Sequence, residues 1–385
     1  MTGSDDPFQR AKALLARGQA ASALAILEGE HPARFTIEAW RDLALARRMV
    51  GDLPGAIAAL DRALLLEPKD FLALLSKGAL LDRAGRSKEA ALVYERALAV
   101  LGGATDIPPT LTAPVTRARE VVAGHSLRLL EHLRASVAPL LARHASEDLD
   151  RFEEALQIYA GAARAHVQQP LLLHYPRLPP IPFHDRALFP WLERLEAASG
   201  VIREEMRLAL QSGCDHIVPY IDYPPDAPVN QWAELNHSRR WSSFFLWRDG
   251  ARQARACELC PRTAELLASL PMADQPGFAP TAMFSILDAR TRIPAHTGSA
   301  NTRLIVHLPL TLPGPAFFRV GNVTRSWRLG EAWVFDDTIE HEAWNDADEP
   351  RAILIFDVWN PLLTVAEREL VSAMMTAKNS FASRD

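Results

Sequence analysis

A repeat of about 34 residues near the N-terminus constrains the fold of this chain more than any other feature. Residues 37–70 and the segment directly after them carry small and large apolar positions in the same order. Ala56 matches Ala90, and Gly51 and Gly85 each stand where a first helix would end. A period of this length is typical of a helix–turn–helix unit that stacks on its neighbours. The sequence therefore predicts stacked pairs of helices.

A degenerate earlier copy, AKALLARGQAASALAILEGEHP, places Gly18 and Ala23 in the same roles. Alanine is needed where two helices cross closely, and bulky residues fill the groove beside it. These segments resemble tetratricopeptide repeats, and the resemblance implies a concave surface for a protein or peptide. An ordinary antiparallel helical bundle, and an arm that caps or dimerises the chain, are the alternatives. We expect the repeats to occupy residues 1–105.

A helical connector is expected over residues 106–174. Gly and Pro in 101–114 predict a linker or cap there. Helical spacing then continues from 115 to 168, and one more helical segment, FPWLERLEAASGVIREEMRLAL, follows a proline-dense stretch at 174–183. The proline-dense stretch marks the expected domain boundary.

After about residue 217 the pattern changes to short segments with period-two alternation and many β-branched and aromatic residues. They include WSSFFLW, TAMFSILD, RLIVHLPL, AFFRV, TRSWRL, EAWVF, HEAW and RAILIFDVW, separated by turn signals such as PG, GN and NDADEP. Many short strands at this spacing are typical of a sandwich, barrel or jelly roll. We therefore expect residues 175–385 to form a strand-rich domain, and the whole chain to be an α+β multidomain protein.

Composition excludes several classes of protein. The 385 residues carry a formal net charge of −5, and no basic stretch interleaves with aromatics, so we expect no nucleic-acid partner. The start of the sequence has no apolar run behind basic residues, so no signal peptide is expected, and no apolar stretch approaches the roughly 20 residues that span a bilayer. Cys214, Cys257 and Cys260 are too few for a secreted disulfide scaffold, which predicts a cytoplasmic protein.

The CELC motif formed by Cys257 and Cys260 has the spacing of a redox site. Such a motif is expected at the start of a helix in a βαβ unit, and no suitable strand pattern precedes it. Structural thiols or a local disulfide are therefore favoured, and their redox state is left open.

Polar residues occupy positions on or beside the predicted strands where apolar residues would be usual. Alternation places Arg303, Ile305 and His307 on one face of their strand. A hairpin at NDADEP would put Arg351 on the strand beside His341. We expect one cavity to collect these polar side chains, which are Ser285, His296, Arg303, His307, His341 and Arg351.

The chemistry of this set points to a metal and an organic acid. Imidazole suits iron, zinc, copper or nickel. Arginine with a hydroxyl suits a carboxylate, because a guanidinium grips it through two parallel hydrogen bonds. Together they suggest non-haem iron with a 2-oxo acid cosubstrate.

The region 175–365 resembles the aspartyl/asparaginyl β-hydroxylase family through FSILDARTRIPAHTGSANTRLIVHLPL, WRLGEAWVFDDTIEHEAWND and RAILIFDVWNP. The resemblance implies an iron(II)- and 2-oxoglutarate-dependent dioxygenase on a double-stranded β-helix, a form of jelly roll. By resemblance, His296 and His341 are the iron ligands, and Arg303 is a substrate contact. The residues implied to bind the cosubstrate are Trp241, Ser285, His307 and Arg351.

Two positions depart from related patterns. The wider superfamily places a carboxylate ligand two residues after the first histidine, where this chain, like the family it resembles, has Gly298. Either water fills that ligand position or Asp337 does, and a role for Asp337 as a hydrogen-bond acceptor is favoured. Ile305 stands where animal members of the family have an arginine, which leaves the substrate open.

The implied substrates are an aspartyl- or asparaginyl-type residue of a peptide or protein, a carrier-bound or free amino acid, or a lipid acyl chain. The implied small-molecule partners are 2-oxoglutarate and dioxygen, and the helical repeats would recruit a protein or peptide substrate. The alternatives are an interaction protein with an inert metal-binding jelly roll, and a hydrolase that uses another metal.

Overall fold

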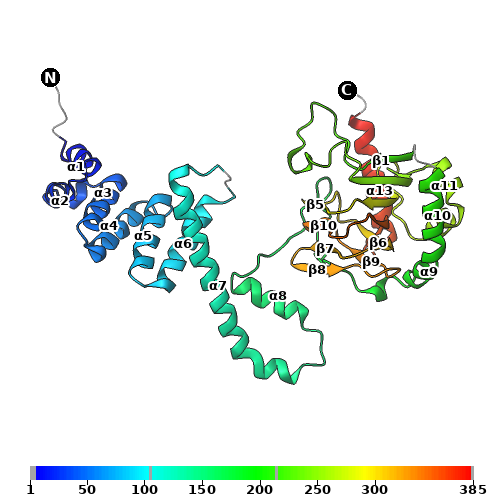
Figure 1. The fold of residues 1–385 in the computed structure, drawn as a ribbon, viewed down its shortest axis with the longest axis horizontal. Coiled ribbons are helices and arrows are strands. Elements are labelled where there is room, and N and C mark those ends of the chain that lie inside the picture. Colours follow the sequence, from blue (N-terminus) through cyan, green and yellow to red (C-terminus); the bar gives the residue numbers. More distant parts are fainter. Residues whose placement is uncertain (1–5, 104–105, 213–215, 383–385) are drawn as a thin grey trace. The chain divides into compact units, whose positions relative to one another are not determined.

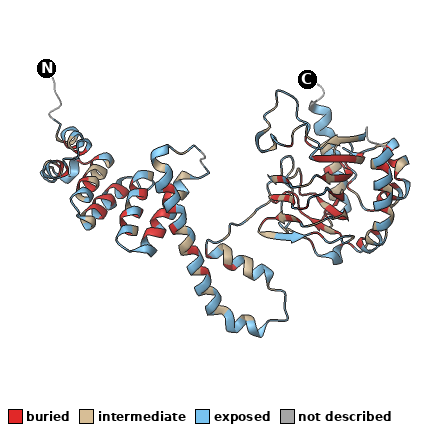
Figure 2. Ribbon diagram, in the orientation of Figure 1, coloured by how far each residue is buried: buried red, intermediate tan, exposed pale blue. Residues whose placement is uncertain are grey.

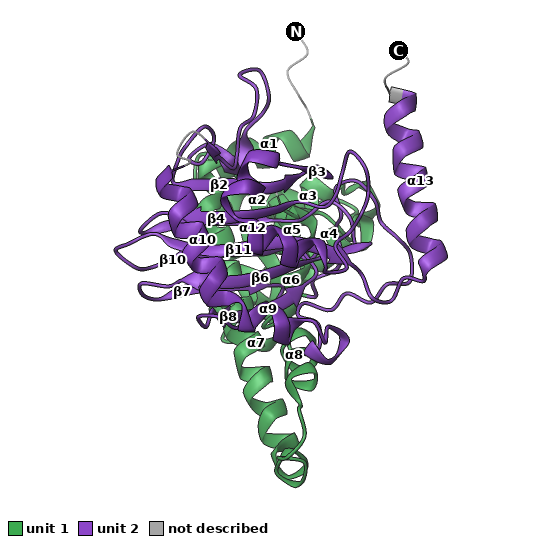
Figure 3. Ribbon diagram, turned by 90° about the vertical axis from the view of Figure 1, so that its right-hand side faces the viewer, with its two compact units in different colours: residues 1–164 green, residues 165–385 purple. Residues whose placement is uncertain are grey.

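The computed structural model describes residues 6–103, 106–212 and 216–382 (Figure 1). The chain divides into two compact units, Met1–Arg164 and Ala165–Asp385 (Figure 3). The first unit is helical, and the second is built on two antiparallel sheets. The finer division of the chain at residues 105 and 174 stays a prediction.

Consecutive helices of the first unit pack in pairs, which confirms the predicted helical repeats (Figure 1). Helix α5 begins and ends 34 residues after α3, and α6 begins 34 residues after α4. The structure therefore preserves the period seen in the sequence. The pairs are α1 (Pro7–Ala16) with α2 (Ala20–Glu28), α3 (Ile37–Met49) with α4 (Leu53–Leu66), and α5 (Phe71–Arg83) with α6 (Ser87–Leu101).

Small residues allow the paired helices to approach each other. Ala56 and Ala90, which match in the repeat, are both fully buried, and Figure 2 shows the buried positions concentrated where the helices pack together. Gly51 and Gly85 adopt φ angles of 90° and 71° in the turns after α3 and α5, a conformation that favours glycine. The predicted alanine and glycine positions are thus confirmed.

The predicted linker at 101–114 was partly wrong. A long helix, α7 (Pro109–Arg143), begins inside it, because proline is tolerated in the first turn of a helix, where its missing N–H costs nothing. The predicted helical stretch to residue 168 was also too long. Helix α8 (Asp150–Tyr159) ends shortly before Gly161, whose φ is 73°.

Two sheets form the second unit, as expected for a jelly roll (Figure 1). The larger sheet has the order β1-β2-β4-β11-β6-β9, with the short β3 paired to β2, and the smaller has the order β5-β10-β7-β8. The strands of the larger sheet are β1 (Ile217–Pro219), β2 (Trp241–Arg248), β3 (Ala251–Arg252), β4 (Ala282–Leu287), β6 (Arg303–Thr311), β9 (Trp333–Phe335) and β11 (Arg351–Trp359). Those of the smaller are β5 (Thr291–His296), β7 (Ala316–Val320), β8 (Val323–Ser326) and β10 (His341–Asn345).

Both faces of the larger sheet are covered. One face packs against helices that come before β1 or between β3 and β4 in the sequence, and the residues of this contact form one apolar cluster. The other face is directed toward the smaller sheet. This explains why eight of the nine residues of β11 are buried. The helices of this unit are α9 (Leu192–Ala197), α10 (Ser199–Ser212), α11 (Ala254–Leu259), α12 (Pro261–Ala268) and α13 (Val365–Ala382).

The hairpin predicted at NDADEP was wrong. Strand β10, which begins at His341, belongs to the smaller sheet, and β11, which begins at Arg351, belongs to the larger one. The loop between them therefore crosses from one sheet to the other. Strand β5, which ends at His296, was not predicted, because its sequence TRIPAH has little of the β-branched alternation that marks strands.

Two further expectations concern thiols and membranes. Cys257 and Cys260 are buried free thiols, and Cys214 lies outside the described residues. The alternative of a local disulfide is therefore not realised.

Among the helices of the described residues, none combines the length and apolarity needed to cross a bilayer.

Candidate active site

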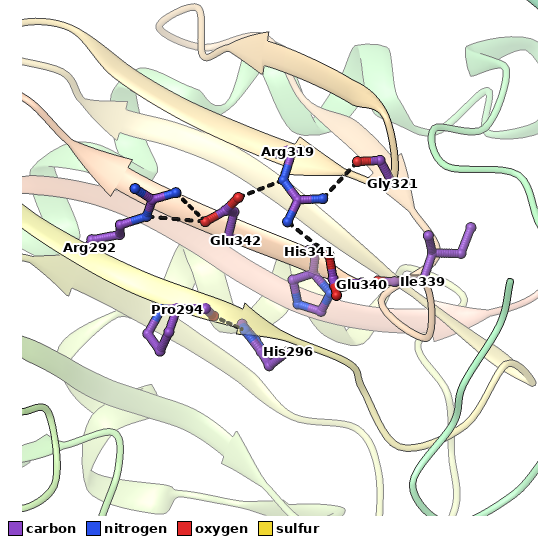
Figure 4. Close-up of polar contacts among 9 residues, drawn as sticks. All are labelled: Arg292, Pro294, His296, Arg319, Gly321, Ile339, Glu340, His341 and Glu342. Atoms are coloured by element: carbon purple, nitrogen blue, oxygen red, sulfur yellow. Dashed lines mark hydrogen bonds and ion pairs between the residues drawn. The ribbon is translucent and has the colours of Figure 1, made fainter. Parts of the chain in front are cut away.

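Two histidines from distant parts of the sequence meet on neighbouring strands. His296 at the end of β5 is the register partner of His341 at the start of β10, and their ring centroids lie 4.1 Å apart. Figure 4 shows both imidazoles on the same side of these strands. The pairing expected from the sequence therefore exists in the fold.

Each imidazole is held in a form suited to ligating a metal. Nδ1 of His296 lies 2.8 Å from the carbonyl oxygen of Pro294, and Nδ1 of His341 lies 3.0 Å from that of Ile339. Because a carbonyl can only accept, Nδ1 donates in both contacts and Nε2 keeps its lone pair. Burial lowers the pKa of both rings, and the neighbouring imidazole lowers that of His341 further. Both rings are therefore neutral near pH 7.

An ion-pair network fixes the two histidine strands from the other face of the smaller sheet (Figure 4). Glu342, next to His341, accepts from Arg319 of β7 at 2.6 Å and from the Arg292 Nε of β5 at 3.1 Å. Arg319 also donates to Glu340 at 3.0 Å. These contacts tie β5, β10 and β7 together directly behind the imidazoles.

A buried arginine lies across the cavity on the larger sheet. Arg351 is 1% exposed, and its Nη1 lies 3.4 Å from both oxygens of Ser285. Within the part of the chain that the structure describes, no carboxylate pairs with it, and its Nε has no hydrogen-bond partner. Burial lowers the pKa of Arg351 to about 9. An unpaired buried charge is costly, so this site is suited to an anion.

Three further residues predicted for the cosubstrate site lie around Arg351. The Trp241 indole N–H donates to Ser285 Oγ at 3.0 Å, which orients the hydroxyl. His307 packs against Phe318 and Phe335, with ring centroids 4.9 and 4.7 Å away. Burial lowers the pKa of His307 well below its usual range, and the charge of Arg351 adds to this shift.

Arg303 lies in the same cavity but already has a partner. Its guanidinium forms a buried ion pair with Asp357 on the neighbouring strand β11. Asp357 also accepts from the Thr281 N–H at 2.9 Å. The charge of Arg303 is therefore largely neutralised by the protein itself, unlike that of Arg351.

Asp337 occupies the space beside Gly298. A Cβ atom added at Gly298 would collide with the Asp337 carboxylate, so a larger residue there would force that carboxylate to move. Burial raises the pKa of Asp337 to about 7. Among the residues that the structure describes, no group of three His, Cys, Asp or Glu side chains is arranged to hold a metal. The two imidazoles thus stand as a pair.

One cavity of about 290 Å³ between the two sheets is lined by every predicted site residue. These residues are Trp241, Ser285, His296, Arg303, His307, His341 and Arg351. The sequence analysis missed other lining residues, among them Leu171, Tyr220, Trp232 and Asp357. Trp232 packs edge-on against His296 at 5.0 Å, and its short helix (Asn230–Trp232) carries no strand or motif signal that could have identified it.

The donor set of the cavity fits iron(II) and 2-oxoglutarate. Two Nε2 lone pairs suit a divalent transition metal, and the unpaired Arg351 with the Ser285 hydroxyl suits a carboxylate.

Part of this chain is similar to a known protein family. Residues 196–361 match the model of the family described as aspartyl/asparaginyl beta-hydroxylase. The match covers less than half of the chain.

Two relatives show how far the similarity to known proteins extends. An ornithine lipid ester-linked acyl 2-hydroxylase of Rhizobium tropici is 34% identical over 199 residues, which is 51% of this chain and 66% of that protein. The human aspartyl/asparaginyl beta-hydroxylase is 39% identical over 142 residues, 36% of this chain and 18% of that protein. The chain thus spans less than two thirds of the length of either relative.

The helical unit has weaker counterparts among solved structures. The match to the Yersinia enterocolitica type III secretion translocator chaperone SycD covers 32% of this chain and 83% of the SycD chain, with 14% identity and a TM-score of 0.28. A score this low supports no conclusion about the function of the helical unit.

Proposed function

We propose that this chain is an iron(II)- and 2-oxoglutarate-dependent dioxygenase that hydroxylates a carbon of its substrate. The observation that carries the proposal is the unpaired, buried Arg351 lying in the same cavity as two neutral imidazoles. An inert cavity has no physical need for a buried cation without an anion. A metal hydrolase would likewise leave Arg351 without a role.

The residues of the cavity take distinct roles in this proposal. His296 and His341 would hold the metal through Nε2, while the backbone carbonyls of Pro294 and Ile339 fix their tautomers. When bound, iron(II) with 2-oxoglutarate and dioxygen supplies the oxidation that inserts one oxygen atom into a C–H bond and yields succinate and carbon dioxide.

Arg351 would bind the distal carboxylate of 2-oxoglutarate in a charge-assisted pair. Trp241 holds the Ser285 hydroxyl toward the same place. His307, kept neutral by burial, would line the cosubstrate site. The aromatic rings of Phe318 and Phe335 line this end of the cavity and would exclude water from it.

A specific observation favours an acyl chain over an aspartyl side chain as substrate. A substrate carboxylate needs a free cation, but Asp357 neutralises Arg303. Ile305 stands where animal members of the resembled family have a second arginine. The cavity also includes exposed apolar and aromatic residues, Leu171, Tyr220 and Tyr223. The similarity to the Rhizobium tropici acyl hydroxylase is consistent with this choice. An aspartyl- or asparaginyl-type residue is the second candidate.

The cytoplasmic location of the chain and a role of the repeats in recruiting a protein or peptide stay predictions. They do not affect the chemistry proposed for the cavity.

The cofactor test uses the full chain with iron(II) and 2-oxoglutarate under argon. We expect a weak visible charge-transfer band with the wild type, no band with His341→Ala, and an unchanged band with His216→Ala, which alters an exposed histidine of the same unit. A wild type without the band would contradict the proposal.

The substrate test adds dioxygen and either an ornithine lipid in detergent micelles or a peptide containing Asp and Asn. Mass spectrometry should find a gain of about 16 Da, one oxygen atom, on the lipid acyl chain. A gain on the peptide alone would reject the acyl chain and support the aspartyl-type substrate.

A further inference from the structure

The segment that enters the second unit crosses the two loops that flank the candidate metal ligands. We call residues 168–173 the strap, residues 297–302 the first loop and residues 336–340 the second loop. The first loop follows His296 directly, and the second loop precedes His341 directly. Any shift of these loops therefore moves an imidazole.

Backbone hydrogen bonds attach the strap to both loops. The Gln169 N–H donates to the Thr338 carbonyl of the second loop at 2.7 Å. The Leu171 N–H donates to the Gly298 carbonyl of the first loop at 2.9 Å. The strap continues beside the first loop, with a 2.9 Å bond from Leu172 to Ser299 and a parallel bridge between Leu173 and Ala300.

The side chain of Gln168 joins the two loops to each other. Its Nε2 donates to Asp336 Oδ2 of the second loop at 2.6 Å, and its Oε1 accepts from Asn301 Nδ2 of the first loop at 3.0 Å. Asp336 and Asn301 are both fully buried. The loops also meet directly, because the Gly298 N–H donates to the Asp337 carbonyl at 2.6 Å. Gln168 thus completes a closed set of contacts between the two histidine-bearing segments.

The strap also forms part of the cavity wall. Leu171 lines the cavity although 72% of its surface is exposed, so an apolar side chain is held at the solvent edge by its backbone contacts. The strap lies before residue 196, where the family match begins. It therefore lies outside the residues that the family model matches, in the segment predicted from sequence to be a connector.

We propose that the strap is part of the active site and that Gln168 is a positioning residue for the metal ligands. The amide holds the first and second loops at the separation at which His296 and His341 share one metal ion. This inference rests on the proposed function, because it assumes that the imidazole pair binds a metal. Groups that are hydrogen-bonded directly to metal ligands typically change metal affinity about 10- to 100-fold when they are removed. Gln168 bonds to Asp336 and Asn301 rather than to the imidazoles, so we expect an effect at the lower end of that range.

The variants to test are made in the full chain. Gln168→Ala removes both contacts, and Gln168→Glu replaces the donor to Asp336 with a second carboxylate, which adds repulsion. Gln169→Ala is the matched control, because that side chain is exposed and the substitution keeps the backbone N–H that bonds Thr338. Far-UV circular dichroism checks that each variant keeps its fold.

The readouts are Co(II) affinity by calorimetry and the visible band of the iron(II)–2-oxoglutarate complex. We expect Co(II) to bind about 10-fold more weakly to Gln168→Ala, more weakly still to Gln168→Glu, and unchanged to Gln169→Ala. The band should shift or weaken in the same order. Unchanged affinity and band in Gln168→Ala would overturn the inference while leaving the proposed function intact.

A measurement on the wild type alone remains decisive if the variants do not fold. Addition of Co(II) and 2-oxoglutarate should slow hydrogen exchange at the amides of Gln169 and Leu171 together with Gly298, because coupling between two sites is reciprocal. Protection of Gly298 without the strap amides would overturn the inference. Failure of the wild type to bind Co(II) would overturn the proposed function itself, and the inference with it.

Discussion

The two units of this chain bury different kinds of side chains. In the helical unit the buried set is dominated by alanine and leucine, and of the described residues in that unit only Ser126 is both polar and buried. In the second unit the described buried set includes charged and titratable groups, among them Asp337, His341, Arg351 and Asp357. The same chain therefore contains one region with an almost purely apolar interior and one with a polar cavity.

The difference separates residues that stabilise the fold from residues that are suited to binding a ligand. Apolar burial contributes to stability in proportion to area and needs no partner. A buried charge costs free energy unless a partner compensates it, and the described residues offer Arg351 no anion. We conclude that the buried residues of the helical unit serve to stabilise it. The second unit buries a charged group, Arg351, and a bound anion would offset the free energy that this burial costs.

Arg351 should give the largest effect and the clearest test of this contrast. Arg351→Met should weaken 2-oxoglutarate binding by about 4 kcal/mol, because it removes a buried charge-assisted pair. Without ligand, the variant should be at least as stable as the wild type, since it also removes a buried charge that has no anionic partner among the described residues and lies over the Trp327 ring, 5.0 Å from the ring centroid. Calorimetric titration and thermal unfolding measure the two quantities.

The control for this prediction is Arg328→Met, which alters an arginine with 77% of its side chain exposed and should change neither quantity. A ligand-free Arg351→Met protein that is clearly less stable than wild type would mean that the arginine is structural.

Leu60 in α4 should give the next largest effect, on stability alone. Leu60→Ala should lower the free energy of unfolding of the helical unit by about 3 kcal/mol, because it leaves a cavity in a packed interior. Urea unfolding followed by far-UV circular dichroism measures this loss. Leu65→Ala, at a position 72% exposed on the same helix, should be close to neutral. A changed affinity for 2-oxoglutarate in folded Leu60→Ala would contradict the separation of roles between the units.

Trp241 should give the smallest effect. Trp241→Phe keeps the aromatic ring but removes the hydrogen bond to Ser285, which is worth about 1 kcal/mol. The affinity for 2-oxoglutarate should fall about fivefold, with little change in unfolding temperature. A loss of about 1 kcal/mol in the free energy of unfolding, with no loss of affinity for 2-oxoglutarate, would mean that the tryptophan only packs the core.

Much of the architecture could be predicted from local sequence patterns. The 34-residue period gave the helix pairs, and alternation placed Arg303, Ile305 and His307 on one face of β6, where all three line the cavity. These predictions hold because helix and strand periodicity follow from backbone geometry over a few residues. The position of β5 could not be found in this way, because its sequence lacks the pattern.

Contacts between distant segments were harder to predict. His341 and Arg351 are ten residues apart, a separation that predicts a hairpin, but the loop passes between two sheets. The contacts of the strap could not be predicted because most of them use backbone groups, which every residue carries. The Arg303–Asp357 pair was missed because a sequence does not show which strands are neighbours.

The sequence by itself determined the repeat, the strand faces and the set of side chains able to bind a metal and a carboxylate. Only the tertiary structure decided which of those groups remain unpaired. Arg303 and Arg351 are the same residue type on neighbouring strands, yet the described residues supply an anion to the first and not to the second. That distinction depends on strand order and burial, which fix the surroundings of each charge, and no local pattern encodes them.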